Sequence, residues 1–292
     1  KNFQGIISSK NEFIKYSSDL NEKNPKRGEY YNHQNFLFTH AKQFENVIII
    51  DEPGSGKSCQ IFQYTEYART QYNLFKEGKD SDWKNSHFKG CIIICKNEAQ
   101  LKQLQGQLIC NCTKKGTYDL PKYSYEKRER QEKLILNDIY KFYQFKTQDS
   151  LWKDLKKKFA VIPDESFSEL DEDRVASAYS DYIFWIDEAH NINPSIETKS
   201  KDAKQLENIY QRFWELFHYA KRIKVFLTTG TPMINEPREI IKVMNLILPI
   251  NLQMPINIDL GTNTTLEDLE PYFRGRVSFI RGAIANAETK YI

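Results

Sequence analysis

Five short apolar runs divide the chain, and polar stretches with helical spacing lie between them. The runs are rich in β-branched or aromatic residues and do not alternate with polar positions, which is typical of strands buried on both faces of a sheet. We therefore expect strands at Val47–Ile50, Cys91–Cys95, Phe159–Ile162, Tyr182–Ile186 and Lys224–Thr228.

Apolar residues recur at three- and four-residue intervals after the first and fourth runs, which predicts amphipathic helices there. The positions concerned are Ile61, Thr65, Ala68 and Tyr72, and then Leu206, Ile209, Phe213 and Leu216. Strands that alternate with helices in this way predict an α/β fold, a mostly parallel sheet with helices on both faces.

Two stretches depart from this alternation. Residues 111–158 are rich in Lys, Glu and Tyr, and we expect a partly solvated helical insertion there. After Pro249 the pattern is broken by prolines and a glycine, so we expect residues 261–292 to form a linker and the start of a second domain. The predicted layout is thus an N-terminal extension over 1–32, a main domain over 33–260, and that linker.

Composition narrows the class of protein. With 292 residues, 40% hydrophobic and 28% charged, the chain is able to bury a full core, and no apolar run approaches the roughly 20 residues of a membrane span. Its net charge of +3 is too small to establish a nucleic-acid partner. Five cysteines cannot all pair and lack zinc-finger spacing, so we expect them to be reduced in an intracellular protein.

The first strand leads into a glycine-containing turn, Asp51–Ser58, and then into a helix. Gly54 and Gly56 allow consecutive amides to face a phosphate chain, and the helix adds its positive end. Lys57 supplies a charge to the outer phosphates and Ser58 a hydroxyl ligand for Mg²⁺. Asp51 stands where this pattern usually begins with glycine, and a plain turn is the alternative interpretation. We expect the nucleotide phosphates to contact Pro53, Gly54, Ser55, Gly56, Lys57, Ser58 and Cys59.

The fourth strand ends in two adjacent acids, Asp187 and Glu188. Ligands of open α/β sheets bind outside the carboxyl ends of the strands, so this position suits catalysis. Asp187 is suited to hold a metal ion, and Glu188 to orient and deprotonate a water molecule. The alternative is a pair of solvated helix-capping acids, which the preceding apolar run argues against. The fifth strand leads into Thr228–Asn235, where threonine hydroxyls could bond to the acid pair, but the residues alone favour a simple strand-ending turn.

The combination resembles the motifs of superfamily 2 helicases. Asp51–Ser58 is similar to motif I in its SNF2-like form, Asp187–His190 to the DEAH form of motif II, and Thr229–Asn235 to motif III. The weaker matches are His33–Gln34 to the upstream glutamine motif, Cys91–Lys96 to motif Ia, and Phe159–Phe167 to motif Ib. Phe273–Phe279 is similar to a string in poxvirus-type NTPases, a group that includes the large subunit of the viral early transcription factor.

The resemblance implies a RecA-like P-loop NTPase domain that binds ATP and Mg²⁺. It assigns catalysis to Lys57, Asp187 and Glu188, metal binding to Ser58 and Asp187, and recognition of adenine to Gln34. It also implies that His190, Thr229 and Thr231 couple nucleotide state to motion. Nucleic acid would contact Lys96, Asn97 and Asp164–Ser166, with DNA favoured over RNA.

The resemblance further implies partners: a second RecA-like domain, and an RNA polymerase or transcription-factor subunit. No membrane is expected, and the implied location is intracellular, in the host cytoplasm and virion if the chain is viral. Without an arginine from a second domain, hydrolysis by this chain alone should be weak. The alternative function is a transcription-initiation scaffold that uses ATP only as a switch. Both interpretations require Lys57 to meet Asp187 and Glu188 at neighbouring strand ends.

Overall fold

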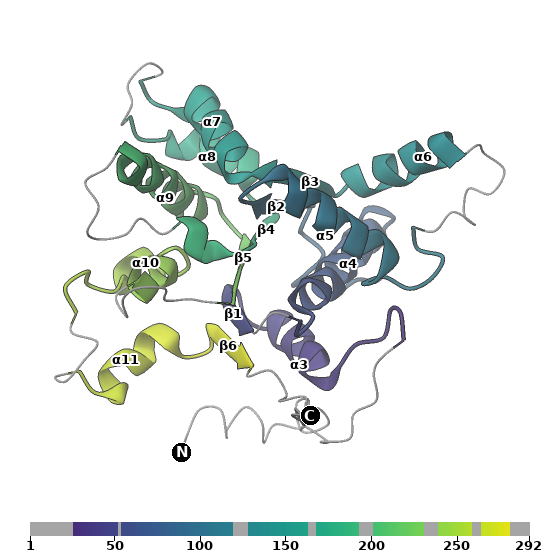
Figure 1. The fold of residues 1–292 in the computed structure, drawn as a ribbon, viewed down its shortest axis with the longest axis horizontal. Helices are drawn as coiled ribbons and strands as arrows, with labels where there is room; N and C mark the ends of the chain where they lie inside the picture. The colour runs from purple at the N-terminus through teal and green to yellow at the C-terminus, as the bar shows by residue number, and fades with distance from the viewer. Residues whose placement is uncertain are drawn as a thin grey trace, which may run out of the picture.

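The computed structural model describes residues 26–51, 54–118, 128–162, 168–192, 201–230, 239–258 and 264–280. They form a six-stranded sheet in the order β3-β2-β4-β5-β1-β6, in which every pairing of neighbouring strands is parallel (Figure 1). The strands are β1 (Val47–Asp51), β2 (Gly90–Cys95), β3 (Tyr143–Thr147), β4 (Tyr182–Ile186), β5 (Lys224–Thr229) and β6 (Val277–Ile280).

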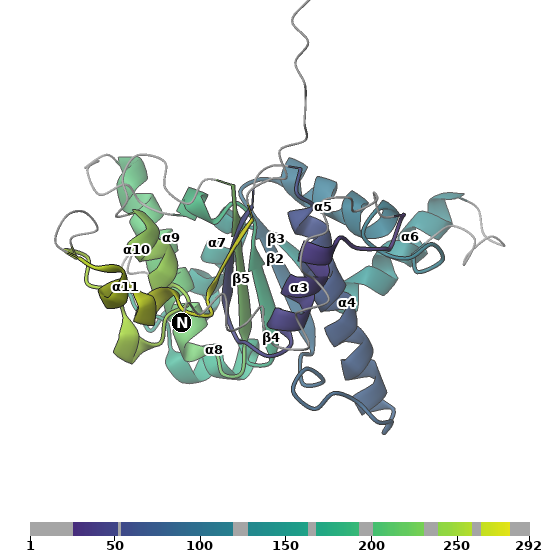
Figure 2. The same cartoon turned by 90° about the horizontal axis from the view of Figure 1, so that it is seen from below.

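Helices cover both faces of the sheet, as the sequence predicted (Figure 2). One face carries α3 (Asn32–Ala41), α4 (Lys57–Lys76), α5 (Glu98–Cys110) and α6 (Arg128–Tyr140). The other carries α7 (Gln148–Phe159), α8 (Glu172–Tyr179), α9 (Lys201–Tyr219), α10 (Glu239–Asn245) and α11 (Leu266–Phe273). Two short 3₁₀ helices, η2 (Ala189–Ile192) and η3 (Ile250–Leu252), complete the described elements.

Each central strand contributes to two hydrophobic cores, one on either side of the sheet. In β4, Phe184 and Ile186 face the core under α9, whereas Ile183 and Trp185 face the core under α4. All four side chains are fully buried. Burial on both faces requires apolar residues at consecutive positions, and this is why the central strands lack alternation in the sequence.

Four of the five predicted strands are confirmed, and the prediction at Phe159–Ile162 is wrong. Phe159 ends α7, and Ala160 makes only an isolated antiparallel bridge to Leu170. One strand that the sequence did not predict is β3 at the edge of the sheet, where Tyr143 is buried and Gln144 is exposed. An edge strand has one neighbour and a partly solvated face, so its sequence is mixed rather than uniformly apolar.

The structure also differs from the expected layout at both of the irregular stretches. Part of the predicted insertion, β3 and α7, belongs to the sheet and its covering layer, whereas α6 is a helix as expected. Towards the end of the chain, β6 pairs with β1, so Val277–Ile280 extends the main sheet rather than beginning a second domain. None of the helices in the described ranges is both long enough and apolar enough to cross a bilayer.

Candidate nucleotide site

The loop between β1 and α4 has the backbone shape of a phosphate cradle. Gly54 and Gly56 adopt φ values of 89° and 83°, a left-handed conformation that glycine adopts without strain. A Cβ at Gly56 would collide with the amide of Gln34. The hydroxyl of Ser55 is buried beside the Asp51 carboxyl group. A left-handed glycine turn at the start of a helix fits a bound phosphate chain. Pro53, which we expected to contact it, lies outside the described residues.

Asp51, at the position usually taken by glycine, ties the loop to α4. It is 1% exposed, and its Oδ2 accepts a hydrogen bond from Gln60 Nε2 at 2.9 Å. Its backbone oxygen accepts one from Lys57 Nζ at 3.0 Å. Burial raises the pKa of this carboxyl group. The aspartate at this irregular position of the motif therefore adds one side-chain contact, to Gln60 in α4, while the bond from Lys57 uses a backbone oxygen that glycine also has.

Asp187 is held at the carboxyl end of β4 by the neighbouring strands. Thr228 of β5 donates from its hydroxyl to Asp187 Oδ1 at 2.9 Å, and the Asp187 amide donates to the oxygen of Ile94 in β2 at 2.9 Å. Burial raises the pKa of the Asp187 carboxyl group, and the charge of Glu188 raises it further. A carboxylate that is costly to ionise when alone is well matched to a divalent cation.

Glu188 has a left-handed backbone, φ 51°, which is uncommon outside glycine. Its Oε1 lies 3.7 Å from Lys57 Nζ, and its Oε2 accepts from the Gly230 amide at 3.4 Å. The loop after β1 and the acid after β4 thus meet, although β5 lies between these strands. The sequence interpretation required this meeting at neighbouring strand ends; Lys57 and Glu188 do meet, but the two strands that carry them are not neighbours.

His190 connects motif II to the end of β5. Its Nδ1 lies 2.9 Å from Thr229 Oγ1 and 3.3 Å from Glu188 Oε2. Of the three residues predicted to couple nucleotide state to motion, the structure brings His190 and Thr229 together. Thr231 lies outside the described residues.

The upstream motif lies against the phosphate loop. Gln34 Nε2 donates to the oxygen of Gly56 at 3.1 Å, while its Oε1 accepts from the Tyr31 amide at 2.8 Å. His33 Nε2 lies 3.0 Å from the oxygen of Ser55. Ser58 follows Lys57 in the first turn of α4, and so does Cys59. Cys59 forms a disulfide with Cys112, so the prediction that every cysteine is reduced is wrong for this pair.

The predicted nucleic-acid contacts lie at the same edge of the sheet. Lys96 Nζ donates to Asn191 Oδ1 at 3.2 Å, whereas the Asn97 side chain caps α5 by accepting from the Gln100 amide at 3.0 Å. The sequence interpretation missed Thr147, which caps α7 at the carboxyl end of β3. Its signal was a threonine directly before a helical pattern. Asp164–Ser166 lie outside the described residues.

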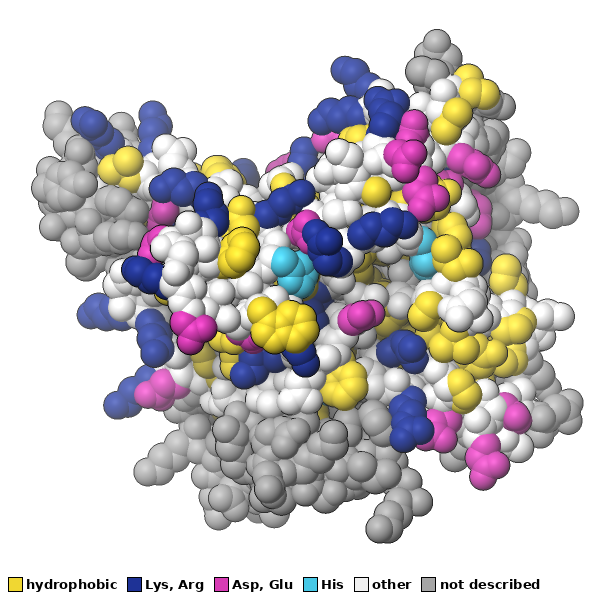
Figure 3. All heavy atoms as spheres, turned by 180° about the vertical axis from the view of Figure 1, so that it is seen from behind, with side chains coloured by type: hydrophobic (Ala, Val, Ile, Leu, Met, Phe, Trp, Pro, Cys, Tyr) yellow, Lys and Arg dark blue, Asp and Glu magenta, His cyan; other side chains and the backbone are white. Residues whose placement is uncertain are grey.

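Charges of both signs are mixed on the face of the molecule opposite to that of Figure 1. On the face seen in Figure 3, Lys and Arg side chains lie among Asp and Glu side chains rather than in one basic patch. Lys156, Lys157 and Lys158 occupy the last turn of α7, where the helix dipole favours cations. These lysines therefore have a local structural explanation.

A pocket of about 770 Å³ lies at the opposite end of the strands, beside Asn46 and Arg276. Asn46 directly precedes β1, and Arg276 directly precedes β6. The pocket is therefore separate from the cradle, which lies where β1 ends.

The chain is similar in sequence to proteins of two large DNA viruses. The chain is 24% identical over 264 residues to "Putative helicase 009L" of Frog virus 3 (isolate Goorha), and 26% identical over 302 residues to "Putative helicase 087L" of Invertebrate iridescent virus 3. These matches cover 88% and 99% of the chain but only 24% and 27% of the relatives, so the chain spans about a quarter of their length. No protein-family model matches the chain.

The fold also has a counterpart among solved structures. The SWI2/SNF2 ATPase core of Sulfolobus solfataricus, solved in complex with dsDNA, matches with a TM-score of 0.50 and 18% sequence identity. The match covers 89% of this chain and 45% of that one. The chain therefore shares the fold of the matched part of this SWI2/SNF2 ATPase core and is similar over most of its length to viral proteins named as putative helicases, which confirms the resemblance to superfamily 2 helicases that its motifs predicted.

Proposed function

We propose that this chain binds ATP with Mg²⁺ and hydrolyses it as the motor domain of a superfamily 2, nucleic-acid-dependent ATPase. One observation carries the proposal: Lys57 Nζ lies 3.7 Å from Glu188 Oε1 at the meeting point of two motifs that are 131 positions apart in sequence (188 − 57). A phosphate-binding lysine beside a carboxylate on a glycine-turn cradle is the arrangement that phosphoryl transfer to water needs.

The chain's own residues divide the work of binding. The amides of the Gly54–Gly56 turn and the start of α4 face the phosphates, and Lys57 neutralises their outer charge. Ser58 and Asp187 would hold Mg²⁺, which when bound neutralises charge that develops on the phosphate oxygens. Thr228 fixes the orientation of the Asp187 carboxylate through their hydrogen bond. Gln34, which contacts the cradle at Gly56, is the proposed reader of adenine.

Glu188 is the proposed general base. Its side chain is 29% exposed, so water reaches it, and its two oxygens are oriented by Lys57 on one side and by Gly230 and His190 on the other. A carboxylate held in this way accepts a proton from a water molecule aimed at the terminal phosphate. Because His190 also contacts Thr229, a change at Glu188 reaches the segment that follows β5.

We also propose that nucleic acid binds along the carboxyl edge of the sheet, near Lys96, Asn97 and Thr147. The relatives are named as putative helicases, and the structural neighbour was solved with dsDNA, which supports DNA as the partner. The relatives are about four times as long as this chain, which leaves room for the proposed second RecA-like domain and for segments that bind transcription proteins.

Phosphate release with and without DNA tests the proposal. A motor domain should show ATP binding that requires Mg²⁺, and release that DNA stimulates when the second domain is present. ATP binding without any stimulated release would support the switch-type scaffold instead. Absence of ATP binding by the folded protein would remove both functions.

A further inference from the structure

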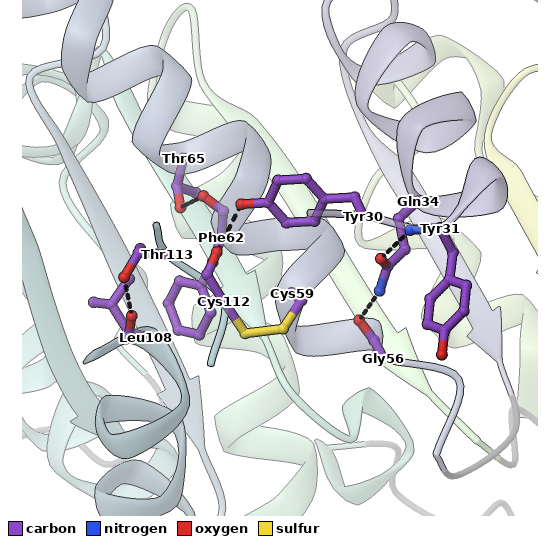
Figure 4. Close-up of a disulfide and its surroundings, with 10 residues drawn as sticks. All are labelled: Tyr30, Tyr31, Gln34, Gly56, Cys59, Phe62, Thr65, Leu108, Cys112 and Thr113. Atoms are coloured by element: carbon purple, nitrogen blue, oxygen red, sulfur yellow. Dashed lines mark hydrogen bonds between the residues drawn. A yellow bond between two sulfur atoms is a disulfide. The ribbon is translucent and has the colours of Figure 1, made fainter. Parts of the chain in front are cut away.

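A disulfide lies directly beside the proposed phosphate cradle. Cys59, in the first turn of α4, is bonded to Cys112, which follows α5 (Figure 4). The two cysteines are 53 positions apart in sequence, and their Cα atoms are 4.7 Å apart. Cys59 comes two residues after Lys57 and directly after Ser58. The covalent bond therefore joins the part of the loop that would contact phosphate and metal to a turn from another segment.

Hydrogen bonds connect this disulfide to the motif that carries Gln34. Tyr30 donates from its hydroxyl to the oxygen of Cys112 at 2.6 Å, and burial raises the pKa of Tyr30 to about 12, so the hydroxyl keeps its proton. Gln34 Nε2 and the Cys59 amide both donate to the oxygen of Gly56, at 3.1 Å and 3.0 Å. These contacts and the disulfide form one closed ring around the start of α4 (Figure 4).

A second set of contacts fixes the other side of this ring. Arg27 Nη2 donates to the oxygen of Ile109 at 2.6 Å, and Gly28 packs so closely on Lys114 that a side chain there would collide with its backbone. The turn that carries Cys112 is thus held against the chain preceding α3. Because that turn is anchored independently, the disulfide transmits its position to Cys59 and the cradle.

We propose that the Cys59–Cys112 disulfide is a thiol–disulfide exchange site for a dithiol reductant, and that its reduction weakens nucleotide binding at the adjoining cradle. The proposal rests on the proposed function, because it assigns a redox response to the same nucleotide site. The evidence for the redox proposal is the ring of contacts that links the disulfide to the start of α4.

The exchange balances without any further reactant. One thiolate of the reductant attacks a protein sulfur, forms a mixed disulfide and releases the other cysteine as a thiolate. The second thiol of the reductant then closes its own disulfide and releases the remaining cysteine. The protein gains two electrons and two protons, and the dithiol loses them. Cys112 is buried and Cys59 is half-buried, so the reductant attacks the sulfur of Cys59 and releases Cys112 first. The positive end of α4 then stabilises the Cys59 thiolate that is released in the second step.

The other cysteines do not compete for this bond. Cys91 and Cys95 are buried in β2, and burial raises the pKa of Cys95 to about 12, so that it stays a thiol. Cys110 is exposed and free, only two residues from Cys112, and therefore offers a matched control. Removing Cys110 takes away a thiol near the site without touching the disulfide.

Reduction should loosen the cradle without removing any of its ligands. In the oxidised form the first turn of α4 is held before nucleotide arrives, whereas in the reduced form binding must order it. Ordering a few side chains and a turn on binding lowers affinity by roughly three- to tenfold. We expect that rise in the dissociation constant for Mg²⁺–ATP.

The test compares one protein in two redox states. The chain is oxidised with oxidised glutathione or reduced with dithiothreitol, which is then removed, and alkylation with mass spectrometry distinguishes three free thiols from five. Binding of a fluorescent ATP analogue is then titrated below the melting temperature of both forms. We expect the weaker binding in the reduced protein, the same response in Cys110→Ser, and no response in a Cys59→Ala/Cys112→Ala double variant.

Equal dissociation constants for verified oxidised and reduced proteins would overturn the proposal, and so would a redox response that persists in the double variant. If the double variant does not fold, the dissociation constants of the oxidised and reduced wild-type protein are still sufficient to test the proposal. Failure of the proposed function looks different: the oxidised protein would then bind no more nucleotide than Lys57→Ala does.

Discussion

The Thr228 hydroxyl donates a hydrogen bond to Asp187 Oδ1 at 2.9 Å and accepts one from the Trp185 indole N–H, also at 2.9 Å. Trp185 lies in β4 and Thr228 in the adjacent β5, both fully buried, and Asp187 directly follows β4. One hydroxyl thus orients the proposed metal ligand and satisfies a buried indole in the core. This pairing explains how a threonine within a strand contributes to a site that lies beyond the strand end.

Replacing Thr228 therefore tests the orientation of Asp187. Thr228→Val keeps the shape but leaves a buried indole unpaired, which should cost about 1–3 kcal/mol of unfolding free energy. It should also weaken binding of Mg²⁺–ATP more than binding of ATP without metal. Thr228→Ser keeps both hydrogen bonds and serves as the control. Titrations with and without Mg²⁺ make the comparison, and equal losses in the two would argue against the metal-ligand role of Asp187.

Substitutions of Lys57 and Glu188 should have different effects on ATP binding and on ATP hydrolysis. Lys57→Ala removes the cation beside the phosphates, so nucleotide affinity should fall. Glu188→Gln keeps the shape and loses the base, so binding should persist while phosphate release falls by about 10²–10⁴-fold. The comparison requires the longer protein that supplies the second domain. Turnover by the Gln variant at the wild-type rate would remove Glu188 from the role of base.

The fold could be predicted where strands are buried on both faces and not where they lie at an edge. Uniform apolar runs identified β1, β2, β4 and β5, which occupy the four central positions of the sheet. The two strands that were missed, β3 and β6, are the two edges. Each has a single neighbour, so neither needs the uniform apolar run that marks the central strands.

The site residues at the ends of central strands could likewise be predicted from the sequence, whereas the one at an edge strand could not. Motifs at the ends of central strands located Lys57, Asp187 and Glu188, because parallel strands bring their carboxyl ends to one edge of the sheet. Thr147 was missed together with its edge strand. The Cys59–Cys112 pairing could not be predicted either, since it depends on how α5 passes the start of α4, and spacing along the chain carries no such information.

The buried carboxyl of Asp51 gives a prediction for the dependence of stability on pH. Burial raises its pKa in the folded state, so the folded protein binds this proton more tightly than the unfolded chain does. The free energy of unfolding should then fall as pH rises from the unfolded pKa, about 3.9, through the folded value. The cost at neutral pH is about 1.4 kcal/mol for each pKa unit of the shift.

Asp51→Asn removes that titration while keeping an oxygen for Gln60. We expect the variant to be more stable than wild type at pH 8, with the difference shrinking towards pH 4, as measured by urea unfolding. Asp51→Ala, which also loses the acceptor for Gln60, should not show the same gain. A difference that does not change with pH would show that Asp51 is not the titrating group.

The disulfide should also stabilise the fold. Closing a loop between positions 53 residues apart restricts the unfolded chain, and the loop-entropy relation gives about 4 kcal/mol. Reduced protein should therefore unfold at lower urea concentration than oxidised protein, with Cys110→Ser behaving as wild type in both states. Coincident unfolding curves for the two redox states would contradict this prediction, because they would show that the bond adds nothing to the free energy of unfolding.

Lys96 provides the last prediction, because it lies at the carboxyl edge of β2 and is joined to Asn191 just after motif II. If its ammonium contacts a DNA phosphate, Lys96→Ala should weaken binding of every DNA sequence alike and lower the slope of log affinity against log salt by about one. Lys141, at the opposite end of the strands and 74% exposed, is the matched control. Fluorescence anisotropy over a range of salt concentrations measures both slopes. Equal slopes for Lys96→Ala and Lys141→Ala would place the DNA path away from this edge.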